Sequence, residues 1–199
     1  MRKRSALLIV VLLLGCTAVA KADPVQWVAG NGHWYNVVLQ ADVPWDTARA
    51  AAQSLGAGWD LATVTSAGEQ AFIAGLLQPC AGAICEYWLG GFQPEGSAEP
   101  AGNWQWINSE GVFWDNGATA MYSDWGALEP NNGGGEPYLA MDNRYSWGWN
   151  DTGPGYYSVL EGYVAEFAGS PEIPEPASLL LVGSGLGAFG LIAFRRRRK

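Results

Sequence analysis

Basic residues are scarce over most of this chain. Nine of its eleven Lys and Arg residues lie in the first 21 or the last five positions, and between Asp23 and Phe194 only Arg49 and Arg144 stand against 19 Asp and Glu. Such an acidic stretch repels the phosphate backbone of nucleic acids and favours soluble cations or neutral ligands. The sequence therefore predicts no nucleic-acid partner.

Histidine is the scarcest ionisable residue. His33, the only one, lies beside aromatic residues in an apparent strand, which indicates a structural role. Without a second histidine or a free reactive cysteine, the usual nucleophile and base arrangements find little support, and we expect no enzyme. A glycosidase site with paired carboxylates from Glu110, Asp115 and Asp124 is a weaker alternative, because acids are common throughout the chain.

Cysteine is nearly as rare, with three in the chain. Cys16 falls in the apolar N-terminal run, which leaves Cys80 and Cys85 in "CAGAIC". Two thiols are too few for a zinc site, and an oxidising exterior would let them close a small loop. We predict a disulfide between Cys80 and Cys85.

Tryptophan, in contrast, is abundant. All eleven Trp lie between Trp27 and Trp149 in a chain of 199 residues. Disordered segments are poor in large apolar rings, so this region indicates a densely packed domain. The length suits one domain with its own core.

The N-terminus has the sections of a secretory signal peptide. "MRKR" precedes an apolar run from Ala6 to Cys16, and "AVAKAD" supplies small residues for cleavage after Ala22. We predict that residues 1–22 are removed. The rival interpretation is a lipoprotein signal, because "LLGC" ending at Cys16 resembles a lipobox.

The C-terminus has three parts. Pro174, Glu175 and Pro176 precede an uncharged run from Ala177 to Phe194, which is about the shortest helix that spans a bilayer, and five basic residues follow. The positive-inside rule places the basic end in the cytoplasm and the acidic domain outside. A simple membrane anchor is one interpretation of this segment.

The same tail, residues 173–199, resembles the PEP-CTERM sorting signal of Gram-negative bacteria. That resemblance implies recognition and cleavage by an exosortase near Pro174-Glu175-Pro176. It predicts export across the inner membrane and a place at the cell surface or in the extracellular matrix, with residues 177–199 as transmembrane helix and basic tail.

Between the two signals, residues 23–168 read as one α+β domain, joined to the tail by a linker over residues 169–176. Two helices are predicted early, one in "PWDTARAAAQSLGAG" and one that opens with a capping box at Ser66 and Glu69. Short strands are predicted in "GHWYNVVLQ", "LATVT", "YWLGGF", "NWQWIN", "YLAMD", "SWGWND" and "GYVAEF". Long loops among them, from about residue 93 to 155, are typical of a functional region.

Oxygen-bearing side chains gather in "EPNNGGGEP" and in "WND". Calcium takes about six to eight oxygen ligands from carboxylates, amide carbonyls and water, and tolerates irregular geometry. Zinc would need His or Cys, so calcium is the chemically favoured ion. Taken alone, however, Glu-Pro-Asn-Asn is also ordinary turn vocabulary.

The order of these motifs resembles the C-type lectin-like domain over residues 25–168. The family order is a Trp followed by a helix, then "YWLGG", a Trp before "EPN", "WND" and a terminal strand "YVAEF". The resemblance implies two helices packed on small antiparallel sheets with a long calcium and ligand loop.

The resemblance also implies a site. The peptide before Pro130 would be cis, and both the calcium ion and the sugar would be held by five residues: Glu129, Asn131, Glu136, Asn150 and Asp151. In sugar-binding members two vicinal hydroxyls of a hexose coordinate the calcium, and the Glu-Pro-Asn order matches mannose- or glucose-type sugars. Trp147 and Trp149, near the loop, are candidates for stacking on a sugar.

The sequence also departs from the family pattern. Ala51 or Ala52, Tyr138 and Ala165 stand near positions where the family has disulfide-forming cysteines, so the aromatic core must compensate. The stretch from Asn132 to Glu136 is about one residue shorter than in familiar sugar binders, and no second, auxiliary calcium site is expected.

Two functions from different classes follow. The first is an exported, calcium-dependent carbohydrate-binding protein that acts in adhesion or matrix association, with exopolysaccharide or a surface glycan as its partner. The second is a lectin-like scaffold that binds protein or serves structurally without sugar.

Overall fold

The computed structural model describes residues 23–79, 82–119 and 121–169. The chain divides between Gly169 and Ser170, and every described residue lies on the N-terminal side of that division. The predicted signal peptide, linker motif, membrane helix and basic tail therefore lie outside the described residues. Within the described part, no helix is long and apolar enough to cross a membrane.

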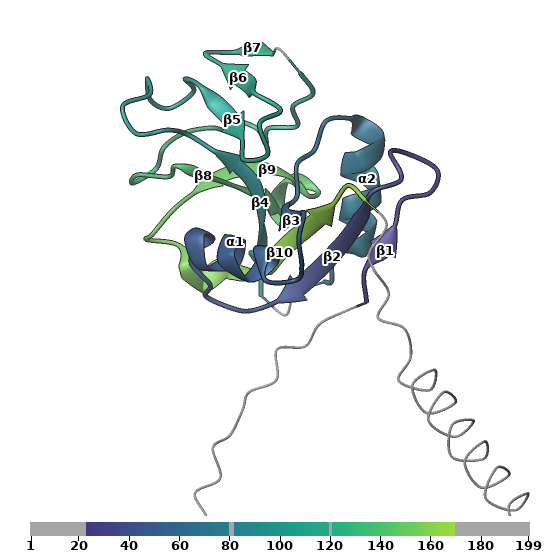
Figure 1. Cartoon of the computed structure of the whole chain (residues 1–199). Helices are drawn as coiled ribbons and strands as arrows, with labels where there is room; N and C mark the ends of the chain where they lie inside the picture. Colours follow the sequence, from purple (N-terminus) through teal and green to yellow (C-terminus); the bar gives the residue numbers. More distant parts are fainter. Residues whose placement is uncertain (1–22, 80–81, 120, 170–199) are drawn as a thin grey trace, which may run out of the picture. The chain divides into compact units, whose positions relative to one another are not determined.

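Two α-helices and ten strands make up the described domain (Figure 1). The helices are α1 (Trp45–Gln53) and α2 (Ala67–Leu76), with short 3-10 helices η1 (Asn143–Tyr145) and η2 (Tyr157–Val159). The strands are β1 (Val25–Gln26), β2 (Trp34–Leu39), β3 (Trp59–Leu61), β4 (Glu86–Phe92), β5 (Trp104–Trp106), β6 (Val112–Asp115), β7 (Ala118–Thr119), β8 (Tyr138–Asp142), β9 (Gly148–Thr152) and β10 (Leu160–Phe167). The α+β class is confirmed.

Both helices begin where the sequence predicts. α1 follows Pro44, which has extended backbone geometry, and buries Trp45, Ala48 and Ala52 at helical spacing. At α2 the side chain of Ser66 accepts a hydrogen bond from the Glu69 amide. The second half of a capping box, a bond from the Ser66 amide to the Glu69 carboxylate, is wrong here. The Glu69 carboxylate accepts instead from the Thr65 amide at 2.7 Å and from the Thr65 hydroxyl at 2.9 Å.

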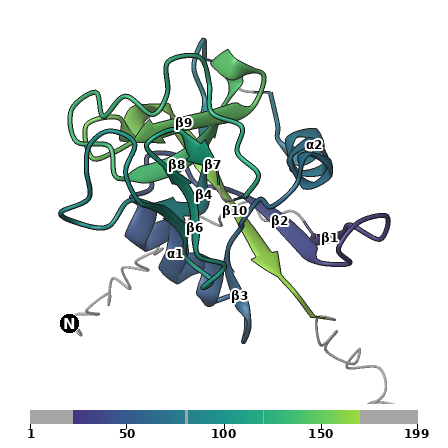
Figure 2. The ribbon, with the colours of Figure 1, turned by 90° about the horizontal axis from the view of Figure 1, so that it is seen from above.

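The sheet is mixed rather than purely antiparallel. β10 pairs with β2 and β3 in antiparallel register but runs parallel to β4, and β8 lies between β4 and β9. In both views α1 and α2 lie on opposite sides of β2 and β10 (Figures 1 and 2). The expected strand in "LATVT" is shifted, since β3 ends at Leu61 and residues 62–65 are not strand.

The core forms two clusters, one associated with each helix. One includes Ile73 of α2 with Trp104, Trp106, Phe113 and Trp149, and the other includes Trp45 and Ala48 of α1 with Trp88 and Tyr163. The tryptophans are thus the main filling of the domain, as their number predicts. Both clusters include residues of β8, the strand that follows the loop of residues 129–136.

Candidate functional site

A cavity of about 230 Å³ opens beside the loop of residues 129–136, and we call it the loop cavity. Its walls come from β4, η1, β9, the loop of residues 129–136 and the segment before β10. The lining residues are Ile84, Glu86, Glu129, Asn131, Gly133, Glu136, Arg144, Asn150, Thr152, Tyr156 and Val159. Four of the five predicted site residues therefore meet at one cavity, and Asp151 is the exception.

The peptide between Glu129 and Pro130 is cis, as predicted. One oxygen of the Glu129 carboxylate accepts a 2.6 Å hydrogen bond from the Tyr145 hydroxyl, and the other accepts from the Asn131 side-chain amide. That bond to Glu129 raises the pKa of Tyr145 to about 12. Because Asn131 gives its NH₂ group to Glu129, the carbonyl oxygen of the same amide remains for another partner.

Glu136 reaches the cavity although the stretch before it is short. Its carboxylate accepts from the Gly133 amide, and its own amide donates to the side-chain oxygen of Asn132 at 2.8 Å. A Cβ added at Gly133 would lie 2.9 Å from Asn131 Oδ1 and 3.1 Å from Glu136 Oε2. The glycine therefore leaves a small space that these two oxygens face.

Asp151 supports the loop from outside the cavity lining. Asn150 and Asp151 are successive residues of β9, so their side chains point to opposite faces of the sheet. The Asp151 carboxylate accepts from the backbone amides of Asn131, at 2.9 and 3.0 Å, and of Asn132, at 2.6 Å. Burial raises the pKa of Asp151 to about 7, although these amide bonds oppose the shift.

Glu86 is the cavity residue that the sequence motifs did not indicate. It begins β4, is 1% exposed, and accepts a 2.9 Å bond from the Asn150 side-chain amide. Burial raises the pKa of Glu86 to about 8, and the neighbouring Asp142 carboxyl adds to the shift. The available signal was a charged residue at the head of the otherwise apolar "EYWLGGF".

The loop cavity fits a hard cation. Its polar walls offer carboxylate and amide oxygens, the donor atoms that calcium prefers. Two buried side-chain oxygens of lining residues, Glu86 Oε2 and Thr152 Oγ1, have no hydrogen-bond partner. Burial also raises the pKa of Glu136, and a bound cation would favour the ionised form of this carboxyl. Arg144, which lies 2.5 Å from Asp142 and 3.3 Å from Glu86, is the basic residue in the lining.

Comparison with known proteins bears on the tail and on the domain. Residues 172–198 match the PEP-CTERM protein-sorting motif, which implies export and surface sorting. Over 108 residues, or 54% of the chain, the sequence is 32% identical to ladderlectin of Oncorhynchus mykiss. This chain therefore spans about half the length of ladderlectin, 50% of it.

Solved structures match over more of the chain. The C-type lectin CEL-I from Cucumaria echinata aligns with 72% of this chain and 96% of its own, with 21% identity and a TM-score of 0.55. This domain has a C-type lectin-like fold. A calcium-independent type II antifreeze protein also aligns, over 74% of this chain and 94% of its own, with 19% identity and a TM-score of 0.50.

This domain packs other side chains near positions where the resembled family has disulfide-forming cysteines. Ala52 of α1 and Ala165 of β10 are both 0% exposed and belong to the same core cluster. Tyr138 stacks on Trp45 with ring centroids 4.6 Å apart and an angle of 8°. Cys85 is disulfide-bonded. Its predicted partner, Cys80, lies outside the described residues, so the pairing stays a prediction.

The two candidate stacking tryptophans belong to the lectin-like core rather than to an open surface. Trp149 is 0% exposed and donates its indole N–H to Gln70 Oε1 at 2.9 Å, so the expectation that it could stack on a sugar is wrong. Trp147 is partly buried and packs its ring edge to face against Tyr87, 5.8 Å away.

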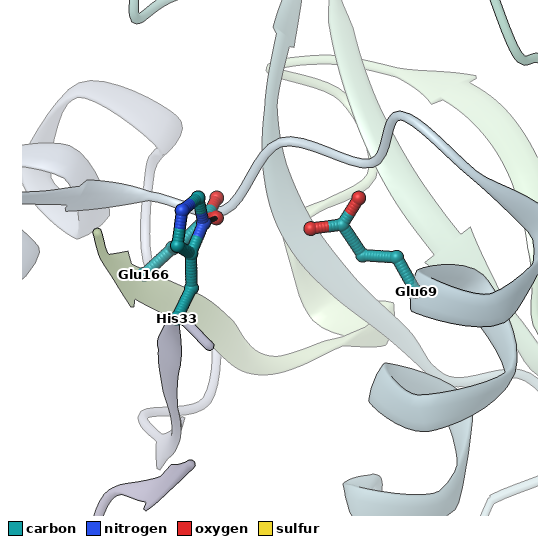
Figure 3. A group of neighbouring side chains, drawn as sticks. All are labelled: His33, Glu69 and Glu166. Atoms are coloured by element: carbon teal, nitrogen blue, oxygen red, sulfur yellow. Dashed lines mark hydrogen bonds and ion pairs between the residues drawn. The ribbon is translucent and has the colours of Figure 1, made fainter. Parts of the chain in front are cut away.

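A second group of ionisable side chains lies where the start of β2 and the end of β10 meet α2 (Figure 3). His33 lies beside Glu166 of β10 with its Nδ1 2.6 Å from Oε1, and Glu69 projects toward the pair from α2. Possible ligand atoms of these three residues lie within 4.8 Å of one another. Tyr35 links the two acids, with its hydroxyl 2.5 Å from Glu69 and 3.2 Å from Glu166. We call these residues the terminal-strand network.

Proposed function

We propose that this protein is an exported, calcium-dependent carbohydrate-binding protein of the cell surface or extracellular matrix. The observation that carries the proposal is the convergence of Glu129, Asn131, Glu136 and Asn150 on one cavity in a C-type lectin-like fold. Thr152 Oγ1, a buried oxygen without a hydrogen-bond partner at the same cavity, supports cation binding there. The relatives named as lectins, ladderlectin and CEL-I, favour a binding protein over an enzyme.

The residues of the loop cavity would divide the work of binding. Carboxylate and amide carbonyl oxygens of Glu129, Asn131, Glu136, Asn150 and Asp151 would hold the ion. Asp151 would also hold the loop in shape through its bonds to two backbone amides. Bound calcium would offer coordination positions for two vicinal sugar hydroxyls. Carboxylates would accept from those hydroxyls and amide NH₂ groups would donate to them. By the family resemblance, the Glu129-Pro130-Asn131 order favours mannose- or glucose-type sugars.

The sorting motif supplies the location. We propose that residues 1–22 direct export across the inner membrane of a Gram-negative bacterium, that residues 177–199 engage the membrane, and that an exosortase cleaves near Pro174-Glu175-Pro176. The acidic domain, residues 23–168, would then remain at the surface or in extracellular polymer. Binding to exopolysaccharide would give it a role in adhesion.

A glycan array read with calcium and then with a chelator tests this proposal. We expect binding to mannose-type glycans that the chelator abolishes. The double variant Glu129→Gln with Asn131→Asp should lose the mannose preference, whereas Glu110→Gln, at an exposed position outside the cavity lining, should keep it. Retained mannose preference in the double variant would rule out the proposed ligand geometry.

A lectin-like scaffold that binds protein without sugar is the second candidate. The observation in its favour is the likeness to a calcium-independent type II antifreeze protein. Calcium that leaves the melting temperature unchanged, together with an array on which no glycan binds, would favour this candidate.

A further inference from the structure

Glu86 and Asn150 meet across an intervening strand. β8 separates β4 from β9, and the register pairs Trp88 with Ala140 and Ala140 with Asn150. Directly paired residues share a face, so Glu86, two positions from Trp88, lies on the same face as Asn150. Glu86 itself pairs with Asp142, two residues along β8, so its 2.9 Å bond to Asn150 crosses β8 diagonally, past the small side chain of Ala140.

The bond fixes which end of the Asn150 amide faces Glu86. Glu86 Oε1 receives the Asn150 NH₂ at 2.9 Å and an Arg144 guanidinium N–H at 3.3 Å. With two donors directed at it, Oε1 acts as an acceptor whether or not the carboxyl carries a proton on its other oxygen. The NH₂ end of Asn150 therefore faces Glu86, and its carbonyl oxygen is the end left for the cavity.

Glu86 is itself held in place. It is 1% exposed, and Arg144 ties it to Asp142, which is 0% exposed. Arg144 is in turn fixed by its backbone amide, 2.7 Å from Asp142 Oδ1, and by its Nε, 2.8 Å from Asp142 Oδ2. A side chain immobilised in this way can hold another in one orientation, as the partners of metal ligands commonly do.

We infer that Glu86 is a positioning residue of the cation site, which orients the Asn150 amide so that its carbonyl oxygen faces the bound ion. The inference rests on the proposed function, because it requires the cation to bind in the loop cavity. Glu86 acts through Asn150 in this assignment, so its effect on binding depends on the amide being present.

Calcium titration by calorimetry on the full chain, with calcium alone as the probe, tests the inference. Glu86→Met keeps similar bulk but removes the acceptor, and we expect it to weaken calcium binding by about 10–100-fold. Glu86→Gln keeps a carbonyl acceptor and should restore most of the affinity, with a loss below about 10-fold. Glu166→Gln, a buried acid in the terminal-strand network, serves as the matched control and should change stability without changing calcium affinity.

A double-mutant cycle separates positioning from ligation. In an Asn150→Ala background, Glu86→Met should weaken calcium binding no further, because the side chain through which it acts is gone. A full additional loss in that background would overturn the inference, as would wild-type affinity in Glu86→Met. A folded Glu86→Gln protein that binds as poorly as Glu86→Met would also overturn it. Absence of calcium binding by the wild-type chain would instead overturn the proposed function along with the inference.

Discussion

The loop cavity and the terminal-strand network both gather buried carboxylates, but they satisfy them differently. In the network, Glu166 Oε2 accepts from the amide and hydroxyl of Thr63 at 2.9 and 3.1 Å, and Glu69 receives two bonds from Thr65 and further bonds from Tyr35 and Asn31. At the loop cavity, Glu86 Oε2 and Thr152 Oγ1 are buried without partners beside open space. Clustered acids are therefore a weak sign of a cation site unless room and unmet oxygen atoms accompany them.

The largest predicted difference between the two regions is their effect on how calcium changes the melting temperature. A ligand at a thousand times its Kd stabilises the folded state by about 4.1 kcal/mol, which would raise Tm by roughly 10 °C in a domain of this size. Glu129→Ala should abolish that rise, because it removes a carboxylate from the loop cavity. Thermal unfolding with calcium and with chelator measures the effect, and Glu110→Ala is the control. A full calcium response in Glu129→Ala would place the ion elsewhere.

Removing a hydrogen bond from the terminal-strand network should lower stability without changing the response to calcium. Tyr35→Phe removes the hydroxyl that donates to Glu69 at 2.5 Å, and hydrogen bonds to charged groups contribute about 1.5–3 kcal/mol. We expect the free energy of unfolding to fall by about that amount while the calcium-induced rise in Tm stays the same. In the control Tyr87→Phe, the lost bond is a long one of 3.4 Å to the Gln78 carbonyl, so the loss should be smaller. A reduced calcium response in Tyr35→Phe would mean that the network also contributes to cation binding.

The contrast between the two regions also shows what sequence can predict. The order of "EPN" and "WND" indicated the fold, the cis peptide before Pro130 and the convergence of Glu129, Asn131 and Asn150, because a local motif carries each of them. The role of Glu86 depends on the register of three strands, and no local pattern specifies that register. Strand alternation likewise turned Asp151 away from Asn150, toward the amides of the loop.

The network was still harder to predict from sequence. Its members come from β2 and the residue before it, from α2 and from β10. The sequence indicated only a structural role for His33 and a capping role for Glu69. Burial of Glu166 raises its pKa, and its bonds to Thr63 and His33 oppose the shift, so its state is set by partners distant in sequence. Long-range pairing of this kind follows from the fold and leaves no spacing to recognise.

The pH dependence of stability should differ with and without calcium. Asp151 and Glu86 have folded-state pKa values of about 7 and about 8, above the values of about 4 expected in the unfolded chain. The folded state then holds protons that the unfolded state has released, so without calcium these groups lower stability as pH rises from about 4 to about 8. Calcium binds the ionised carboxylates, so its stabilising effect should grow over the same window. Urea unfolding at pH 5, 6, 7 and 8, with calcium and with chelator, measures both trends, and chelated stability that rises with pH would contradict the assignment.

The smallest predicted effect compares two threonines that are each 1% exposed. Thr63 Oγ1 donates to Glu166 and accepts from Asn108, both at 3.1 Å, whereas Thr152 Oγ1 has no partner. Replacement by Val preserves shape, so the change in free energy of unfolding reports the hydroxyl alone. Without calcium, Thr63→Val should cost about 1–1.5 kcal/mol, and Thr152→Val should stay within about 0.5 kcal/mol of wild type or be slightly more stable. Equal losses at the two positions would show that Thr152 is as well bonded as Thr63, and would remove the unmet oxygen that supports the cation site.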